Sequence, residues 1–130
     1  MRLLLDTHVW IWYLTASPDL GSAIRALIES DRNELFLSPI SVWEVLILAE
    51  RGRLDLRPDP QSWTREALNA FPIIEAAFNT EIAIQSRSID LPHDDPADRF
   101  LAATARVYKA VLVTRDRRLL QSNAVETFQA

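Results

Sequence analysis

The 130-residue chain contains no cysteine and only two glycines, Gly21 and Gly52. Without cysteine the protein has no disulfide bond, no thiolate metal site and no cysteine nucleophile. Two glycines are too few for the glycine-rich loops of P-loop and dinucleotide-binding proteins, so both classes are excluded. The two histidines, His8 and His93, are likewise too few for a histidine-rich zinc site.

Long apolar runs are also missing. No stretch approaches the ~20 apolar residues that a membrane-spanning helix requires. The apolar N-terminus is interrupted by Asp6 and His8, so it does not match a signal peptide. We therefore expect no membrane association. A reducing, cytoplasmic location agrees with the lack of cysteine.

What is present favours a folded protein. Hydrophobic residues make up 48% of the chain and charged residues 25%, which predicts a single globular domain over residues 1–130. The net charge of −4 looks wrong for a nucleic-acid binder, but thirteen of the fourteen basic residues are arginine, which suits bidentate contacts with phosphate. Residues 99–118 hold six basic residues against one acid, which predicts a local basic patch. These six are Arg99, Arg106, Lys109, Arg115, Arg117 and Arg118.

Hydrophobic periodicity and capping signals predict strands that alternate with helices. The predicted strands cover residues 2–5, 34–37, 71–75, 110–113 and 125–128. The predicted helices cover residues 7–14, 17–30, 40–51, 59–70, 79–88 and 96–108, and a short helical turn follows residue 116. This alternation indicates an α/β domain with a mainly parallel central sheet.

Two of the predicted strands lead directly into aspartates. Asp6 follows the first strand and Asp116 follows the strand at 110–113. Because ligands bind beyond the carboxyl ends of parallel strands, these two acids are expected at one edge of the sheet. Asp98 stands at the third position of a helix that Asp95 caps, where the helix dipole favours its ionised form.

Glu44 is the fourth acid of interest. Its neighbours at helical spacing are Ile40, Ile47 and Leu48, and a charge in so apolar a segment is costly unless it is paired, protonated or metal-bound. One alternative is an ion pair with a buried arginine.

Four bare carboxylates in one pocket would repel one another. A hard cation such as Mg²⁺ or Mn²⁺ relieves that repulsion, because it takes oxygen ligands. Removing Asp6, Glu44, Asp98 and Asp116 leaves fourteen acidic and fourteen basic residues, so the whole net charge can be assigned to this site. Such a site suits phosphodiester hydrolysis, in which the metal activates water and neutralises charge on the leaving oxygen.

The acids lie within four short motifs that resemble those of the PIN domain. The motifs cover residues 3–8 (LLLDTH), 38–44 (SPISVWE), 95–103 (DPADRFLAA) and 112–116 (LVTRD). Each is weak alone, but their order and spacing extend over nearly the whole chain. The resemblance is greatest to the VapC-like toxins of toxin–antitoxin modules, and it implies a three-layer α/β/α fold.

The resemblance also implies a function. It suggests a Mg²⁺- or Mn²⁺-dependent endoribonuclease that acts on RNA, is neutralised by a cognate antitoxin and forms a homodimer. Asp6 and Asp98 would be the principal metal ligands, while Glu44 and Asp116 would complete the acidic pocket and act on metal or attacking water. The implied supporting residues are Thr7 and Thr114. Asp95 either caps the helix or also contributes to metal binding, and the candidate RNA-binding residues are Arg99, Arg115 and Arg117.

The aromatic residues have simpler interpretations. For the stretch at 10–13 (WIWY) we expect core packing for most side chains and an exposed subset that forms a dimer or antitoxin surface. Trp43 and Trp63 are expected to pack in the interior. His8 is expected to be an ordinary hydrogen-bonded histidine, with a proton shuttle or phosphate contact as the alternative.

Two other functions fit parts of the sequence. An aspartate-based phosphoryl-transfer domain also carries acids at strand ends, but His8 stands where the phosphatase pattern wants a second aspartate, and Lys109 precedes its strand where a receiver wants lysine after it. The other alternative is a catalytically weak PIN-like module that acts by binding partners, since activity depends on fine placement of the acids.

Overall fold

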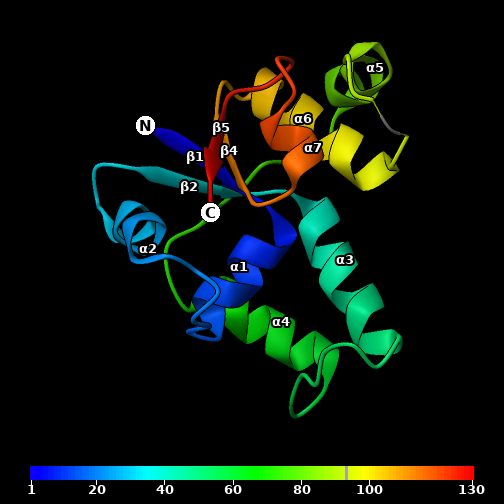
Figure 1. Ribbon diagram of the computed structural model, residues 1–130. Coiled ribbons are helices and arrows are strands. Elements are labelled where there is room, and N and C mark those ends of the chain that lie inside the picture. Colours follow the sequence, from blue (N-terminus) through cyan, green and yellow to red (C-terminus); the bar gives the residue numbers. More distant parts are fainter. Residues whose placement is uncertain (93) are drawn as a thin grey trace.

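Five parallel strands form the central sheet of the computed structural model, which describes residues 1–92 and 94–130 (Figure 1). His93 lies outside the described residues. In chain order the strands are β1 (Arg2–Leu5), β2 (Glu34–Leu37), β3 (Ile74–Glu75), β4 (Val111–Thr114) and β5 (Thr127–Gln129). Their order across the sheet is β3-β2-β1-β4-β5, and every neighbouring pair is parallel. The predicted parallel sheet is confirmed.

The described residues also form seven helices, most of which begin at a side chain that caps them. They are α1 (Thr7–Leu14), α2 (Ser22–Glu29), α3 (Pro39–Glu50), α4 (Pro60–Asn69), α5 (Thr80–Ser88), α6 (Pro96–Val107) and α7 (Arg117–Leu120). Ser38, Asp59 and Asn79 each accept a hydrogen bond from a backbone N–H in the first turn of the helix that follows. Such caps satisfy N–H groups that have no partner within the helix.

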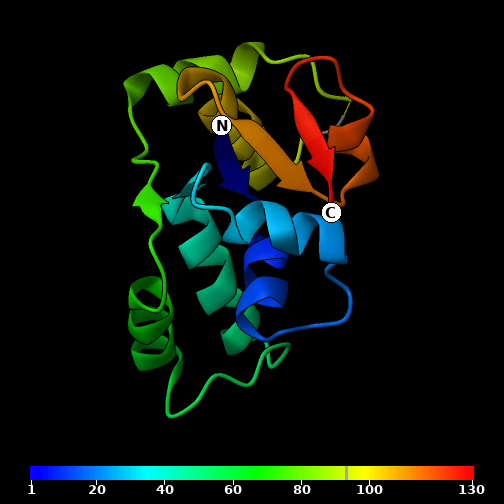
Figure 2. The same cartoon turned by 90° about the vertical axis from the view of Figure 1, so that its left-hand side faces the viewer.

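The helices cover both faces of the sheet. Leu3 and Leu5 point to one face, where they pack in a core with Trp10 and other residues of α1 to α4. Leu4 points to the other face and packs in a second core with Ile82 of α5 and with residues of α6 and α7. Figures 1 and 2 show these two groups of helices on opposite sides of the strands. The predicted three-layer α/β/α arrangement is therefore confirmed.

Most predicted boundaries agree with the structure to within one or two residues, and two elements differ by more. The helix expected over 17–30 begins only at Ser22, because the segment before it forms a turn in which Ser17 Oγ accepts from the Asp19 N–H and Gly21 takes the N-cap position. The strand expected over 71–75 is reduced to β3, a two-residue strand with both residues exposed at the edge of the sheet.

The sheet order defines where a ligand can bind. Strand β1 is central, and the chain builds β2 and β3 on one side of it and β4 and β5 on the other. The carboxyl ends of β1 and β4 are adjacent, because Leu5 pairs with Val113 and the Asp6 N–H donates to the Val113 carbonyl at 3.0 Å. Such a switch point in strand order leaves a crevice beyond the strand ends. In the described part of the chain, no helix has both the length and the apolar character needed to cross a membrane.

Candidate metal centre

Asp6 occupies the carboxyl end of β1 and is the N-cap of α1. Its Oδ1 accepts from the Thr7 N–H at 2.7 Å, and its Oδ2 accepts from the Thr114 hydroxyl at 2.6 Å. Thr114 is the last residue of β4 and is fully buried. Both oxygens of Asp6 are therefore fixed by neutral donors from two neighbouring strand ends.

Glu44 reaches the same edge from the second turn of α3. Thr7 Oγ1 lies 2.7 Å from Glu44 Oε1 and 2.9 Å from Ser41 Oγ. A hydroxyl carries a single proton, so Thr7 donates to the carboxylate and accepts from Ser41. Within residues 1–92 and 94–130 no arginine pairs with Glu44, and the alternative of a buried ion pair is wrong. Ser41, one helical turn before Glu44, is a positioning residue that the sequence did not reveal.

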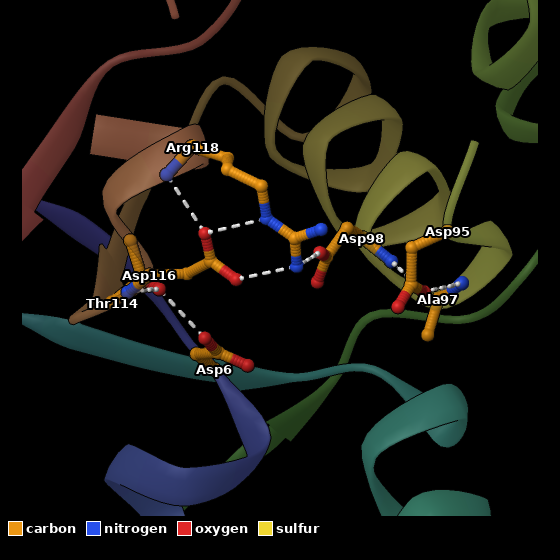
Figure 3. Close-up of polar contacts among 7 residues, drawn as sticks. All are labelled: Asp6, Asp95, Ala97, Asp98, Thr114, Asp116 and Arg118. Carbon is orange, nitrogen blue, oxygen red and sulfur yellow. Dashed lines mark hydrogen bonds and ion pairs between the residues drawn. The ribbon is translucent and has the colours of Figure 1, made fainter. Parts of the chain in front are cut away.

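Asp98 is placed by the start of α6. Asp95 is the N-cap, and its Oδ1 accepts from the N–H groups of Ala97 at 3.0 Å and Asp98 at 3.3 Å. The predicted cap is confirmed, and it presents the Asp98 carboxylate at the first turn of the helix (Figure 3).

Asp116 follows β4 and caps α7. Its N–H donates to Thr114 Oγ1 at 3.1 Å, and its Oδ1 accepts from the Arg118 N–H at 2.8 Å. The Arg118 guanidinium reaches over the pocket, where Nη2 donates to Asp116 Oδ2 at 3.1 Å and to Asp98 Oδ2 at 3.3 Å (Figure 3). Arg118 was counted in the basic segment but was not predicted as a site residue.

These side chains line one pocket of about 330 Å³. The lining contains the four predicted acids and five further residues. The nine lining residues are Asp6, His8, Trp12, Glu44, Asp95, Asp98, Arg115, Asp116 and Arg118. The acids come from the ends of two strands and from two helices. The sheet edge therefore brings together side chains that are more than a hundred residues apart in the sequence.

The electrostatic environment differs between the acids. Burial raises the pKa of Asp6, although the hydrogen bonds from Thr114 and Thr7 oppose that rise. Burial also raises the pKa of Glu44; the Thr7 hydroxyl opposes the rise, and the charge of Asp6 adds to it. For Asp116, burial acts in the same direction, but the hydrogen bonds and positive charge of Arg118 outweigh it and lower the pKa.

The donor set fits a hard divalent cation in its chemistry. Carboxylate oxygens from Asp6, Glu44, Asp95, Asp98 and Asp116 face one pocket, and Mg²⁺ and Mn²⁺ prefer such ligands. In the part of the chain that the structure describes, no three of these groups form a ready-made cation cluster. A bound ion would therefore require some of these side chains to move.

Comparison with known proteins identifies the family of this chain. The PIN domain family model matches residues 3–124. The chain belongs to the PIN domain family. It is 36% identical over 120 residues to ribonuclease VapC22 of Mycobacterium tuberculosis, an alignment that covers 90% of this chain and 88% of the relative. The predicted family and its VapC-like branch are thus confirmed.

Solved structures support the PIN fold. A chain in the crystal structure of VapBC2 from Rickettsia felis, bound to a DNA fragment from their promoter, has a TM-score of 0.72 at 17% identity and covers 99% of this chain and 98% of that one. DNA-bound VapBC from Salmonella typhimurium gives a TM-score of 0.70 at 16% identity, with the same two coverages. At these identities the likeness establishes the fold.

The basic segment of this PIN domain does not form one patch. Arg99 is only 6% exposed, and its guanidinium donates to the carbonyls of Ser86 and Ile89, each at 2.8 Å, at the end of α5. Its proposed contact with RNA is therefore wrong. Arg106 and Lys109 line a different pocket at the far end of α6, roughly 12 Å or more along the helix from Asp98.

Arg115 and Arg117 lie closer to the acids. Arg115 lines the pocket, with its guanidinium 4.5 Å from the centre of the Trp12 ring and hydrogen-bonded to the carbonyls of Asp19 and Ala130. Arg117 is exposed at the first position of α7, outside the pocket lining.

The aromatic side chains fall into two groups. Trp10 is fully buried, whereas Trp12 and Tyr13 are only partly buried, which agrees with the expected mixture of core and surface. Trp63 packs edge-on against Trp10, as expected. Trp43 is 56% exposed, so its expected interior packing is wrong. Helix α3 is apolar on most sides, and its neighbours α1, α4 and α6 cover only some of them.

Proposed function

We propose that the protein is a Mg²⁺- or Mn²⁺-dependent endoribonuclease that hydrolyses RNA phosphodiester bonds. The observation that carries this proposal is a single pocket lined by carboxylates from four separate segments at the carboxyl edge of a parallel sheet. The 36% sequence identity to ribonuclease VapC22, over 90% of this chain, supports hydrolysis of RNA. Carboxylate-bound divalent cations are well suited to phosphodiester chemistry.

In this proposal Asp6 and Asp98 are the principal metal ligands, and Glu44 and Asp116 complete the pocket. A bound cation of this kind supplies an activated water and neutralises charge on the leaving oxygen. Asp95 keeps its role as the cap of α6, which sets the position of Asp98.

The chain's own groups prepare this chemistry. The Thr7 N–H and the Thr114 hydroxyl fix the orientation of the Asp6 carboxylate. The Thr7 hydroxyl holds Oε1 of Glu44, which leaves Oε2 to accept a proton from the attacking water. Burial raises the pKa of Glu44 toward the range in which a carboxylate serves as a general base. Arg115, at the rim, and Arg117, on α7, are proposed to contact RNA phosphates.

We further propose that the protein is the toxin of a toxin–antitoxin module, with a cognate antitoxin and a homodimeric assembly. The VapC22 relative and the VapBC assemblies that share this fold support that role. The partly buried Trp12 and Tyr13 on α1 are candidates for a surface that receives an apolar antitoxin helix. Because its proposed substrate is cellular RNA, the protein would act in the cytoplasm.

The direct test compares Asp6→Asn and Asp98→Asn with a matched control. Asp94→Asn makes the same chemical change four residues before Asp98, at an exposed carboxylate that faces Arg87 at 3.5 Å and lies outside the pocket. Cleavage of a labelled RNA in Mn²⁺ should fall at least about 100-fold in the two pocket variants, because losing a ligand costs more than losing a supporting group. The control should cleave like the wild type, and circular dichroism should show all three variants folded. Wild-type cleavage that persists in excess EDTA would refute the metal mechanism.

A second candidate is a catalytically weak partner-binding module. It is favoured by one observation, namely that the Arg118 guanidinium is hydrogen-bonded to both Asp98 and Asp116. Expression of the chain without its antitoxin distinguishes the two functions. Growth arrest that Asp98→Asn relieves supports the ribonuclease, and harmless expression of the wild type supports the binding module.

A further inference from the structure

Arg118 lies where two of the proposed metal ligands face each other. Its Nη2 donates to Asp98 Oδ2 at 3.3 Å and to Asp116 Oδ2 at 3.1 Å, and its Nε lies 3.4 Å from Asp116 Oδ1 (Figure 3). One guanidinium therefore bridges carboxylates that stand eighteen positions apart in the sequence.

The Arg118 guanidinium and the two carboxylates that it bridges differ in how firmly they are held. Asp98 and Asp116 are 14% and 25% exposed and sit at the starts of two helices, whereas the Arg118 side chain is 51% exposed. An exposed arginine can change rotamer quickly without any change in backbone. The guanidinium is thus the movable member of the group.

Among residues 1–92 and 94–130, no guanidinium is hydrogen-bonded to Asp6 or Glu44 in the other half of the pocket. Asp6 and Glu44 are held by hydroxyl groups and a backbone N–H, which orient the oxygens without neutralising their charge. By contrast, the Arg118 guanidinium pairs with carboxylate oxygens of Asp98 and Asp116. A divalent ion would need the same oxygens as ligands.

We propose that Arg118 is the counter-cation of the metal-free pocket, and that a divalent cation binds by displacing its guanidinium from Asp98 and Asp116. This inference rests on the metal-dependent function proposed above. Metal binding then competes with the arginine, and the apparent affinity is lowered in proportion to the fraction of molecules in which Arg118 occupies the carboxylates. Arg118 would be a positioning residue that sets the metal requirement of the pocket.

The test is a calorimetric Mn²⁺ titration of the full chain, comparing wild type, Arg118→Gln and Arg117→Gln. Arg117 is the adjacent residue of α7, is exposed and lies outside the pocket lining, so its variant makes the same charge change without removing the bridge. Arg118→Gln should bind Mn²⁺ roughly five- to tenfold more tightly than wild type, the modest factor expected for partly exposed ion pairs. Arg117→Gln should change the affinity less than about twofold, because exposed charges are screened by salt.

Thermal unfolding gives a second readout that does not require catalysis. In EDTA, Arg118→Gln should melt below wild type, because Asp98 and Asp116 lose their ion pairs with the Arg118 guanidinium. Saturating Mn²⁺ should then raise its melting temperature by more than it raises that of wild type. Should Arg118→Gln fold only once Mn²⁺ is added, that metal-dependent folding would also support the proposal.

Several outcomes would overturn the proposal. Equal or weaker Mn²⁺ binding by Arg118→Gln would show that the arginine does not compete with the metal. An equal increase in the Mn²⁺ affinity of Arg117→Gln would show that the effect comes from net charge alone. Failure of all three proteins to bind Mn²⁺ would show that there is no metal binding for Arg118 to compete with. Failure of the proposed function looks different: the proteins would bind Mn²⁺ with the predicted ranking but leave RNA intact.

Discussion

Replacing Thr114 with valine would remove one hydroxyl from the floor of the acidic pocket while preserving the shape of the side chain. Thr114 is fully buried; its Oγ1 donates to Asp6 Oδ2 at 2.6 Å and accepts from the Asp116 N–H at 3.1 Å. Valine can do neither. Asp6 therefore loses a hydrogen bond to its carboxylate, and the Asp116 N–H loses its acceptor.

The magnitude follows from these two contacts. A hydrogen bond to a charged group contributes about 1.5–3 kcal/mol, and a buried donor left without a partner costs about 1–3 kcal/mol. Water can reach the partly buried Asp116 N–H and reduce the second cost. We expect Thr114→Val to lower the free energy of unfolding by about 2–4 kcal/mol at neutral pH.

Urea unfolding in EDTA, followed by the fluorescence of the four tryptophans, measures this change. Thr114→Ser is the matched control: it keeps the hydroxyl and loses one methyl group, which costs about 0.8 kcal/mol. A Thr114→Val penalty below about 1 kcal/mol, or one smaller than that of the serine variant, would refute the assigned contacts.

The penalty should also depend on pH. Burial raises the pKa of Asp6 above its ordinary value of 3.8, so its protonated form is favoured in the folded state and its contribution to stability declines as pH rises through the raised pKa. The Thr114 hydroxyl opposes that rise by donating to the charged form. Thr114→Val should therefore differ most from wild type above the pKa of Asp6 and least below it, which unfolding curves recorded over a series of pH values from acidic to neutral will show.

Substitutions at three further positions have expected outcomes. Glu44→Gln should raise the melting temperature of the protein in EDTA at pH 7 by a few degrees, because it keeps the acceptor for Thr7 and removes a carboxylate whose pKa is raised by burial; a lower melting temperature would contradict this. Arg99→Met should lower the free energy of unfolding by about 2–4 kcal/mol, since carbonyls at the end of α5 lose a charged donor, while RNA cleavage per folded molecule stays unchanged. Asp95→Ala should lower the free energy of unfolding by about 1 kcal/mol, because α6 loses its N-cap. Asp95→Asn should keep both the cap and the Mn²⁺ affinity. A weaker Mn²⁺ affinity in Asp95→Asn would show that Asp95 is a metal ligand.

The fold was predictable because its signals are local. Short apolar strands separated by helices with N-caps indicated an α/β sheet, and an aspartate lies one or two residues after each of the two strands at the site. The start of α2 was less predictable, because Ser17 and Asp19 form a turn with the same residue types that cap helices. The edge strand β3 was also overestimated, since its apolar residues have a neighbour on one side only.

The burial of Arg99 is indicated by the residues that follow it in α6. Ala102 and Ala103, three and four positions further along α6, are fully buried, so helical periodicity already placed Arg99 on the inner face. Trp43 had no comparable signal. Helix α3 is apolar around most of its circumference, and periodicity cannot then indicate which face the neighbouring helices cover.

The position of Arg118 could not be read from the sequence, because it depends on how far one flexible side chain reaches across the pocket. That position gives the two halves of the site different chemistry. In the part of the chain that the structure describes, neutral donors fix Asp6 and Glu44 without an arginine, whereas the Arg118 guanidinium pairs with Asp98 and Asp116. A divalent ion would have to compete with Arg118 for Asp98 and Asp116 but would meet no guanidinium from the described residues at Asp6 and Glu44. The acids define what the pocket can bind, and Arg118 determines how strongly an ion must bind to enter it.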